Sequence, residues 1–92
     1  MTATETNYSQ AIHNAKNALK QGERGEARRW AQLAVKLSPN REEPWLILAA
    51  VSTPEASIEY LKRAQSINPN NPTTKAGLVW AQKRLSNSST PS

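Results

Sequence analysis

Several residue types that supply chemistry are scarce or missing in this sequence. There is no cysteine, no phenylalanine and no aspartate, and His13 is the one histidine. Without cysteine the chain can form neither a disulfide framework nor a thiolate metal site. With one histidine and no aspartate, a metal site and a catalytic triad both lack their usual residues. We therefore expect no enzymatic activity, no catalytic residues, no bound metal and no cofactor.

Long apolar runs and targeting signals are missing as well. No stretch approaches the roughly 18 apolar residues that a transmembrane helix needs. The first ten residues, MTATETNYSQ, have neither a basic flank nor an apolar centre, so they do not resemble a signal peptide. We expect a cytoplasmic protein. The polar end of the chain, SNSSTPS, is typical of a linker and leaves open that this domain is the N-terminal module of a longer protein.

The chain is basic and short. Its 92 residues predict one domain with a thin core, and its net charge of +5 favours acidic partners such as nucleic acid, anionic lipid or an acidic peptide. The alternative is that the charge only keeps the surface soluble. Because bulky aromatic residues are few, alanine and leucine must carry the packing, which favours helices that approach each other closely.

Apolar residues recur at three- and four-residue steps, which predicts an all-α fold of five helices. Glycine and proline mark their ends. The expected helices run from Asn7 to Gly22, from Glu23 to Ser38, from about Arg41 to Val51, from Pro54 to just before Pro69, and over 72–86. We expect residues 1–6 to be disordered and residues 87–92 to form a flexible tail or the start of a linker.

The chain contains an internal repeat. Laying Pro39 on Pro69 also pairs Ala34 with Ala64, and a helix pair ends at each proline. A repeated helix pair cannot bury its apolar face alone, so the units are expected to stack into one continuous core.

This pattern resembles the tetratricopeptide repeat, a helical hairpin of 34 residues that closes on a proline. Residues 8–41 match it without a gap, with Gly22 between the helices and small residues at Ala27 and Ala34. The resemblance implies about two and a half repeats: 8–41, a shortened repeat 42–71, and a capping helix 72–86. It implies antiparallel hairpins stacked as a short α-solenoid. It also implies a buried Trp45, with about one helical turn missing before Pro54.

In this family the first helices of the hairpins line a concave groove that binds peptides or partner proteins. The resemblance therefore implies a non-catalytic protein-interaction module. The groove residues carried over to this chain are Ile12, His13, Lys16, Leu46, Ile47, Ala50, Trp80, Lys83 and Arg84. The alternative is that Ile12 and Leu46 belong to the core, and that Trp80 packs on the fourth helix.

A second function class stays open because of the charge. Basic pairs occur in both second helices, and they could form a stripe for phosphate groups: Arg28, Arg29, Lys62 and Arg63. The chain would then be a basic module that binds nucleic acid or an anionic surface. A solvated helical face is the other interpretation of the same residues.

Overall fold

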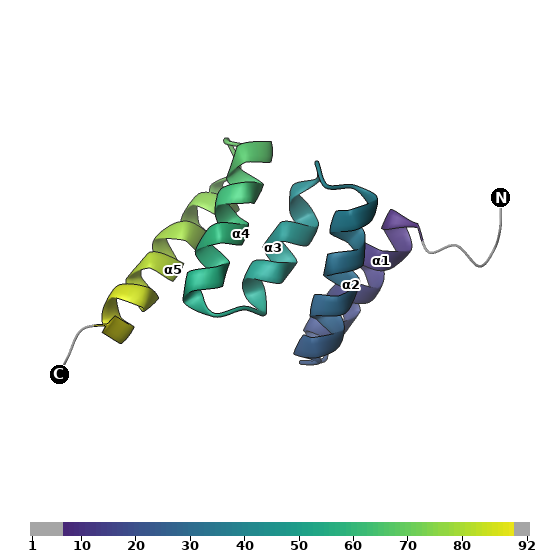
Figure 1. Cartoon of the computed structure of the whole chain (residues 1–92), viewed down its shortest axis with the longest axis horizontal. Helices are drawn as coiled ribbons and strands as arrows, with labels where there is room; N and C mark the ends of the chain where they lie inside the picture. Colours follow the sequence, from purple (N-terminus) through teal and green to yellow (C-terminus); the bar gives the residue numbers. More distant parts are fainter. Residues whose placement is uncertain (1–6, 90–92) are drawn as a thin grey trace.

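Five helices and no strand make up residues 7–89, the part of the chain that the computed structural model describes (Figure 1). The predicted all-α fold is therefore confirmed. The helices are α1 (Tyr8–Lys20), α2 (Arg24–Leu37), α3 (Glu42–Ala50), α4 (Pro54–Ile67) and α5 (Pro72–Ser89). The last helix extends three residues beyond its predicted end, so 87–89 belong to it. The expectations for residues 1–6 and 90–92 lie outside the described residues.

Consecutive helices pack against each other along the whole stack (Figure 1). The chain folds α1 onto α2 and α3 onto α4, and three-residue connections at 21–23 and 51–53 join each pair. Between the pairs, α2 and α1 both contact α3, and α5 packs on α4. The connections are too short for the paired helices to separate, so each pair forms an antiparallel hairpin.

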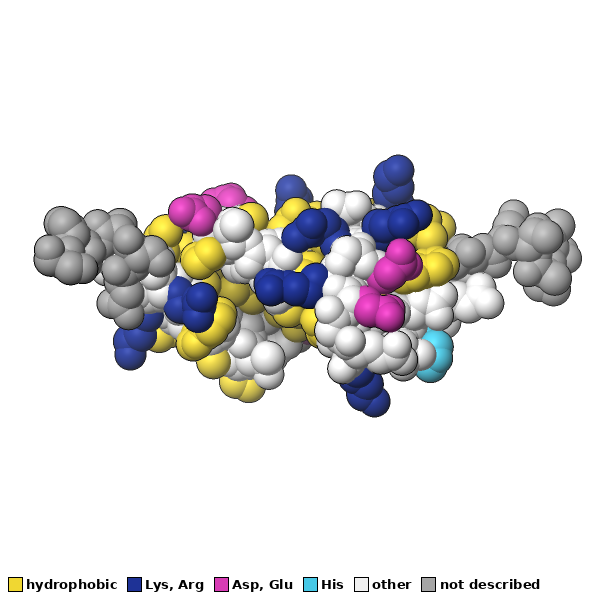
Figure 2. All heavy atoms as spheres, turned by 90° about the horizontal axis from the view of Figure 1, so that it is seen from below, with side chains coloured by type: hydrophobic (Ala, Val, Ile, Leu, Met, Phe, Trp, Pro, Cys, Tyr) yellow, Lys and Arg dark blue, Asp and Glu magenta, His cyan; other side chains and the backbone are white. Residues whose placement is uncertain are grey.

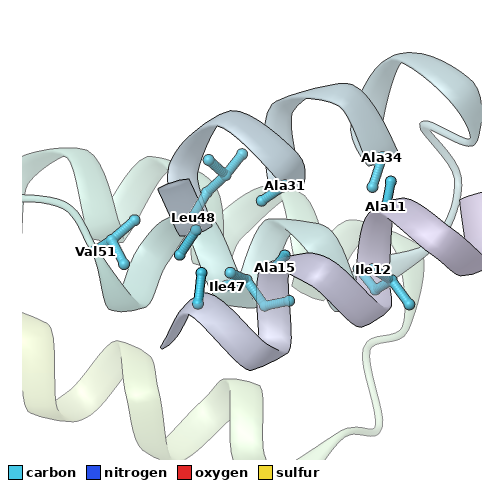
Figure 3. Close-up of a cluster of buried hydrophobic side chains, with 10 residues drawn as sticks. Ala11, Ile12, Ala15, Ala31, Ala34, Ile47, Leu48 and Val51 are labelled. Carbon is cyan, nitrogen blue, oxygen red and sulfur yellow. The ribbon is translucent and has the colours of Figure 1, made fainter. Parts of the chain in front are cut away.

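The core is built largely from alanine (Figure 3). Among the described residues, nine of the fifteen buried apolar side chains, Pro44 included, are alanines. A methyl side chain lets two helix backbones approach closely, but it buries little area. The two small residues of the first repeat, Ala27 and Ala34, are buried in α2, and Ser57 and Ala64 are buried at the equivalent positions of α4.

Gly22 forms the turn between α1 and α2 in a backbone conformation that glycine favours. Its φ is +76°, in the left-handed region. The backbone N–H of Glu23 donates to the carbonyl of Ala18 at 2.8 Å, and that of Gly22 donates to Leu19 at 3.1 Å. These two bonds form a Schellman motif, which satisfies carbonyls that the end of α1 would otherwise leave unpaired.

Helix α3 ends one turn early. It has nine residues, whereas α1 has thirteen. The helical turn that was expected to be missing before Pro54 is therefore missing from the C-terminal end of α3. Three side chains donate to its last carbonyls. Ser52 Oγ donates to Leu48 at 2.7 Å, Ser57 Oγ donates to Ala49 at 2.5 Å, and the Arg28 guanidinium donates to Val51 at 2.6 Å. The end of this helix is therefore capped by its neighbours α2 and α4.

The corner between α4 and α5 is tied back to the start of α3. Glu42 accepts hydrogen bonds from the side-chain amides of Asn68 at 2.7 Å and Asn71 at 2.6 Å. These bonds favour the ionised carboxylate, and they hold the pKa of Glu42 below its usual value of 4.5. The corner between α4 and α5 therefore does more than reverse the chain, because it also ties the end of the second repeat, 42–71, to its own first residue.

Within residues 7–89, no helix is both long enough and apolar enough to cross a membrane.

Glycine-to-alanine changes at two positions should have opposite effects on stability. Gly22→Ala forces a side chain into the left-handed region and should lower the free energy of unfolding by about 1 kcal/mol. Gly25→Ala, in ordinary helical backbone with open space around it, should raise it by about 0.5 kcal/mol. Urea denaturation of both variants checks this pair. Equal effects would mean that the turn at Gly22 is not as described.

The stability contributed by Glu42 should depend on pH. Because its pKa is depressed in the folded state, this contribution is present above about pH 4.5 and is lost as the pH falls through the folded pKa. Glu42→Gln should therefore lower the free energy of unfolding by about 1 kcal/mol at pH 7. The difference between the two proteins should shrink below pH 4.5. Thermal melts from pH 7 to pH 3 measure it, and the other carboxylates cancel because both proteins share them.

Candidate functional site

An apolar pocket of about 200 Å³ lies between α3 and α5, with α4 as its floor. It brings together three of the predicted groove residues, Leu46, Ala50 and Trp80. The other lining residues come from the same three helices: Ala49, Ser57, Leu61, Thr73, Gly77 and Ala81. Only two of the nine lining residues, Ser57 and Thr73, carry a polar side chain, so the pocket suits an apolar group.

Gly77 allows α5 to lie close to α4 at the floor of this pocket. A Cβ atom at this position would stand 3.2 Å from Leu61 Cδ2, which is closer than an ordinary contact. A glycine inside a helix costs roughly 1 kcal/mol relative to alanine. The close approach gives a structural reason for the glycine, because an alanine at this position would require the Leu61 side chain to shift.

Trp80 is the most exposed large apolar side chain among the described residues, at 60%. Most of its surface is therefore not buried against α4. The Arg84 guanidinium lies over its ring, 4.7 Å from the centroid, which limits the orientations that the ring can take. Lys83 lies one helical turn from Trp80 and is exposed. The pocket therefore has a large aromatic edge with two cations beside it.

Two predicted groove residues belong to the core instead. Ile12 is 9% exposed and Ile47 is 6% exposed, and both lie in the cluster of α1, α2 and α3 shown in Figure 3. Nearly every residue of α3 after Glu43 is apolar, so its sequence does not reveal which side faces the core. The prediction chose Leu46 and Ile47 together, although adjacent residues point in directions about 100° apart.

The predicted groove residues on α1 do not reach the pocket. His13 is exposed, and its Nε2 lies 3.1 Å from the Asn17 side-chain amide. Lys16 is exposed and forms an ion pair with Glu43 of α3. The hydrogen bond and the charge of Glu43 raise the pKa of Lys16. The Lys16 ion pair links the first helix to the third, whereas the His13 contact lies within its own helix, and neither residue lines the pocket of Trp80.

The four residues of the predicted basic stripe have different surroundings. Arg28 is engaged with the end of α3, as described above. Arg29 and Lys62 pair with acidic residues on their own helices, Arg29 with Glu26 at 3.3 Å and Lys62 with Glu59 at 3.9 Å. Arg63 lies over the Trp45 ring, 5.3 Å from its centroid. The structure therefore does not arrange the four as one row of free cations.

Trp45 is only half-buried, whereas the family resemblance implied that it would be buried. Its ring lies 6.1 Å from the Tyr60 ring, centroid to centroid, and its Nε1–H donates to the carbonyl of Pro39 at 3.1 Å. The rings line two hollows on the side of α2 and α4, of about 550 Å³ and about 390 Å³. Sequence reasoning missed this pair because no local signal relates a residue of α3 to one of α4.

Basic side chains are spread over the surface with apolar areas between them. Figure 2 shows one face on which Lys and Arg side chains lie along the middle of the molecule beside exposed apolar atoms. Among the described residues, no group of three or more His, Cys, Asp or Glu side chains could hold a metal ion. What these surfaces offer is apolar contact, aromatic faces and positive charge.

No known protein-family model matches this chain, and no curated protein has a similar sequence.

Substitutions of Trp80 and Leu61, an exposed and a buried residue of the pocket, should change the free energy of unfolding by different amounts. Trp80→Ala should change the free energy of unfolding by less than about 1 kcal/mol, because the side chain is mostly exposed. Leu61→Ala should cost about 2–5 kcal/mol, because Leu61 is 6% exposed at the pocket floor. Chemical denaturation followed by circular dichroism measures both. A large cost for Trp80→Ala would place that residue in the core.

Proposed function

We propose that this chain is a non-catalytic interaction module, similar to a short tetratricopeptide array, that binds a peptide or protein segment. The site is the pocket between α3 and α5. The observation that carries the proposal is that Leu46, Ala50 and Trp80 converge on one apolar pocket from two different helices. Their convergence is what the family resemblance leads one to expect of residues on first helices.

The dimensions of the pocket indicate what enters it. At about 200 Å³ it is smaller than the pockets that enclose whole cofactors or metabolites, which are roughly 300–1,000 Å³. It has room for about one large apolar side chain. A leucine, phenylalanine or methionine that protrudes from a partner would fill the pocket and cover the Trp80 ring. Large aromatic residues often carry much of the binding energy of such contacts.

The charges beside the pocket indicate the sequence around that anchor. Lys83 is exposed, and the Arg84 guanidinium is stacked on Trp80 and keeps its charge at the surface. Acidic residues next to the anchor would meet both cations. Exposed charges of this kind mainly raise the association rate and contribute little to the final affinity. The proposed partner therefore presents a bulky apolar residue flanked by aspartate or glutamate.

Selection from a random peptide library displayed on phage tests this proposal without a known partner. Enriched peptides should share a large apolar residue with acidic neighbours. Trp80→Ala should weaken their binding by about 2 kcal/mol, or roughly 30-fold in the dissociation constant. Ala50→Trp, which places a ring at an exposed position on the pocket wall, should weaken it as well.

Val79→Ala is the matched control for this experiment. Val79 is 55% exposed and adjacent to Trp80, but it does not line the pocket. Its substitution should leave the affinity of the selected peptides unchanged. Peptides that bind the wild-type protein and Trp80→Ala equally well would contradict the proposal, and so would a selection that enriches no peptide at all.

A further inference from the structure

A second hollowed surface lies between α2 and α4, on a different side of α3. Its two hollows meet at Trp45 and Tyr60, which line both of them. The larger one also contains Leu33, Val35 and Leu48. We call this surface the aromatic trough. It shares no lining residue with the pocket between α3 and α5.

The two rings of the trough are held in place by contacts within the protein. Trp45 is fixed by its hydrogen bond to the Pro39 carbonyl, and Tyr60 packs against it at an interplanar angle of 36°. Both side chains are half-buried, so parts of them remain accessible. Rings that are already ordered lose little conformational freedom when a flat group stacks on them. The trough therefore offers a prearranged surface for planar rings.

Cationic side chains lie on both walls of the trough. Arg29 and Lys36 stand on the α2 side, and Lys62 and Arg63 on the α4 side. Glu26 and Glu59 are the carboxylates paired with them, so four cations face two anions. The Arg29 side chain is 78% exposed and the Lys62 side chain is 61% exposed. Ion pairs at such exposed positions are weak. Both cations can therefore turn toward an external anion.

We propose that the aromatic trough binds single-stranded nucleic acid. A base would stack beside Arg63 on the accessible parts of Trp45 and Tyr60, and the flanking phosphates would contact Lys36, Lys62 and Arg63. Single strands combine flat rings with regularly spaced negative charges, and proteins bind them through aromatic platforms within positive grooves. The net charge of +5 adds a long-range attraction. An acidic peptide would use the cations but would leave the two rings without a matching group.

Fluorescence anisotropy with a labelled oligouridylate of about eight nucleotides tests this proposal. The logarithm of the binding constant should fall with the logarithm of the salt concentration, with a slope of about −2, because each neutralised phosphate contributes roughly −0.7. Tyr60→Leu removes the ring but keeps an apolar side chain, and it should weaken binding at least about fivefold. Tyr60→Phe keeps the ring and should bind as the wild type does, which separates stacking from folding.

The charge contribution is tested by two double variants of equal net charge. Lys36→Gln with Lys62→Gln removes two trough cations, and it should weaken binding and reduce the salt slope by about 1.4. Lys20→Gln with Lys75→Gln removes two exposed cations on α1 and α5 and should leave the slope unchanged. Trp80→Ala should not affect oligouridylate binding, so this test and that of the peptide pocket succeed or fail separately.

Four outcomes would overturn the proposal. The first is equal weakening by the two double variants, which would mean that only the net charge matters. The second is displacement of the oligonucleotide by polyglutamate of the same charge at the same concentration, which would assign the trough to acidic peptides. The third is no binding at 50 mM salt. Equal affinity of Tyr60→Leu and Tyr60→Phe would likewise exclude stacking on this ring.

Discussion

The early end of α3 at Ala50 is the constraint on which the rest of the structure depends. A nine-residue helix is too short to be stable alone in water, so its neighbours must hold it. Arg28 from α2 and Ser57 from α4 donate to its last carbonyls, and Glu42 at its start accepts from the corner before α5. Side chains from both directions along the stack therefore converge on one short helix.

Because α3 is apolar on almost every side, its side chains contribute to the core, to the aromatic trough and to the pocket beside α5. Ile47, together with Val51 just after the end of the helix, enters the core with α1 and α2. Trp45 and Leu48 face the aromatic trough, and Leu46 with the alanines at the helix end faces α5. A helix that is apolar all round normally lies wholly inside a protein. Here the thin stack leaves two of its three sides partly open, and these are the candidate binding surfaces.

The helices and their ends were predictable from sequence because their signals are local. Proline, glycine and the three- and four-residue spacing act within a few residues, and the alanine register located small residues that are buried in α2 and α4. Which side of α3 faces the core was not predictable. Its residues after Glu43 are all apolar, so no difference between apolar and polar positions marks the buried side. The bonds of Glu42 to Asn68 and Asn71 span 26 and 29 residues, and no sequence spacing specifies such pairs.

The difference between local and long-range signals also explains why the sequence predicted part of the pocket between α3 and α5 but not the aromatic trough. Three of the groove residues that the register suggested, Leu46, Ala50 and Trp80, line one pocket, because a repeat pattern relates helices that lie side by side. It could not show that Arg28 reaches across to the Val51 carbonyl or that Tyr60 packs on Trp45, since those contacts depend on side-chain directions across helices. Both candidate surfaces take residues from α3, yet no side chain lines both. Each can therefore change by substitution without altering the other, provided that the caps holding α3 are kept.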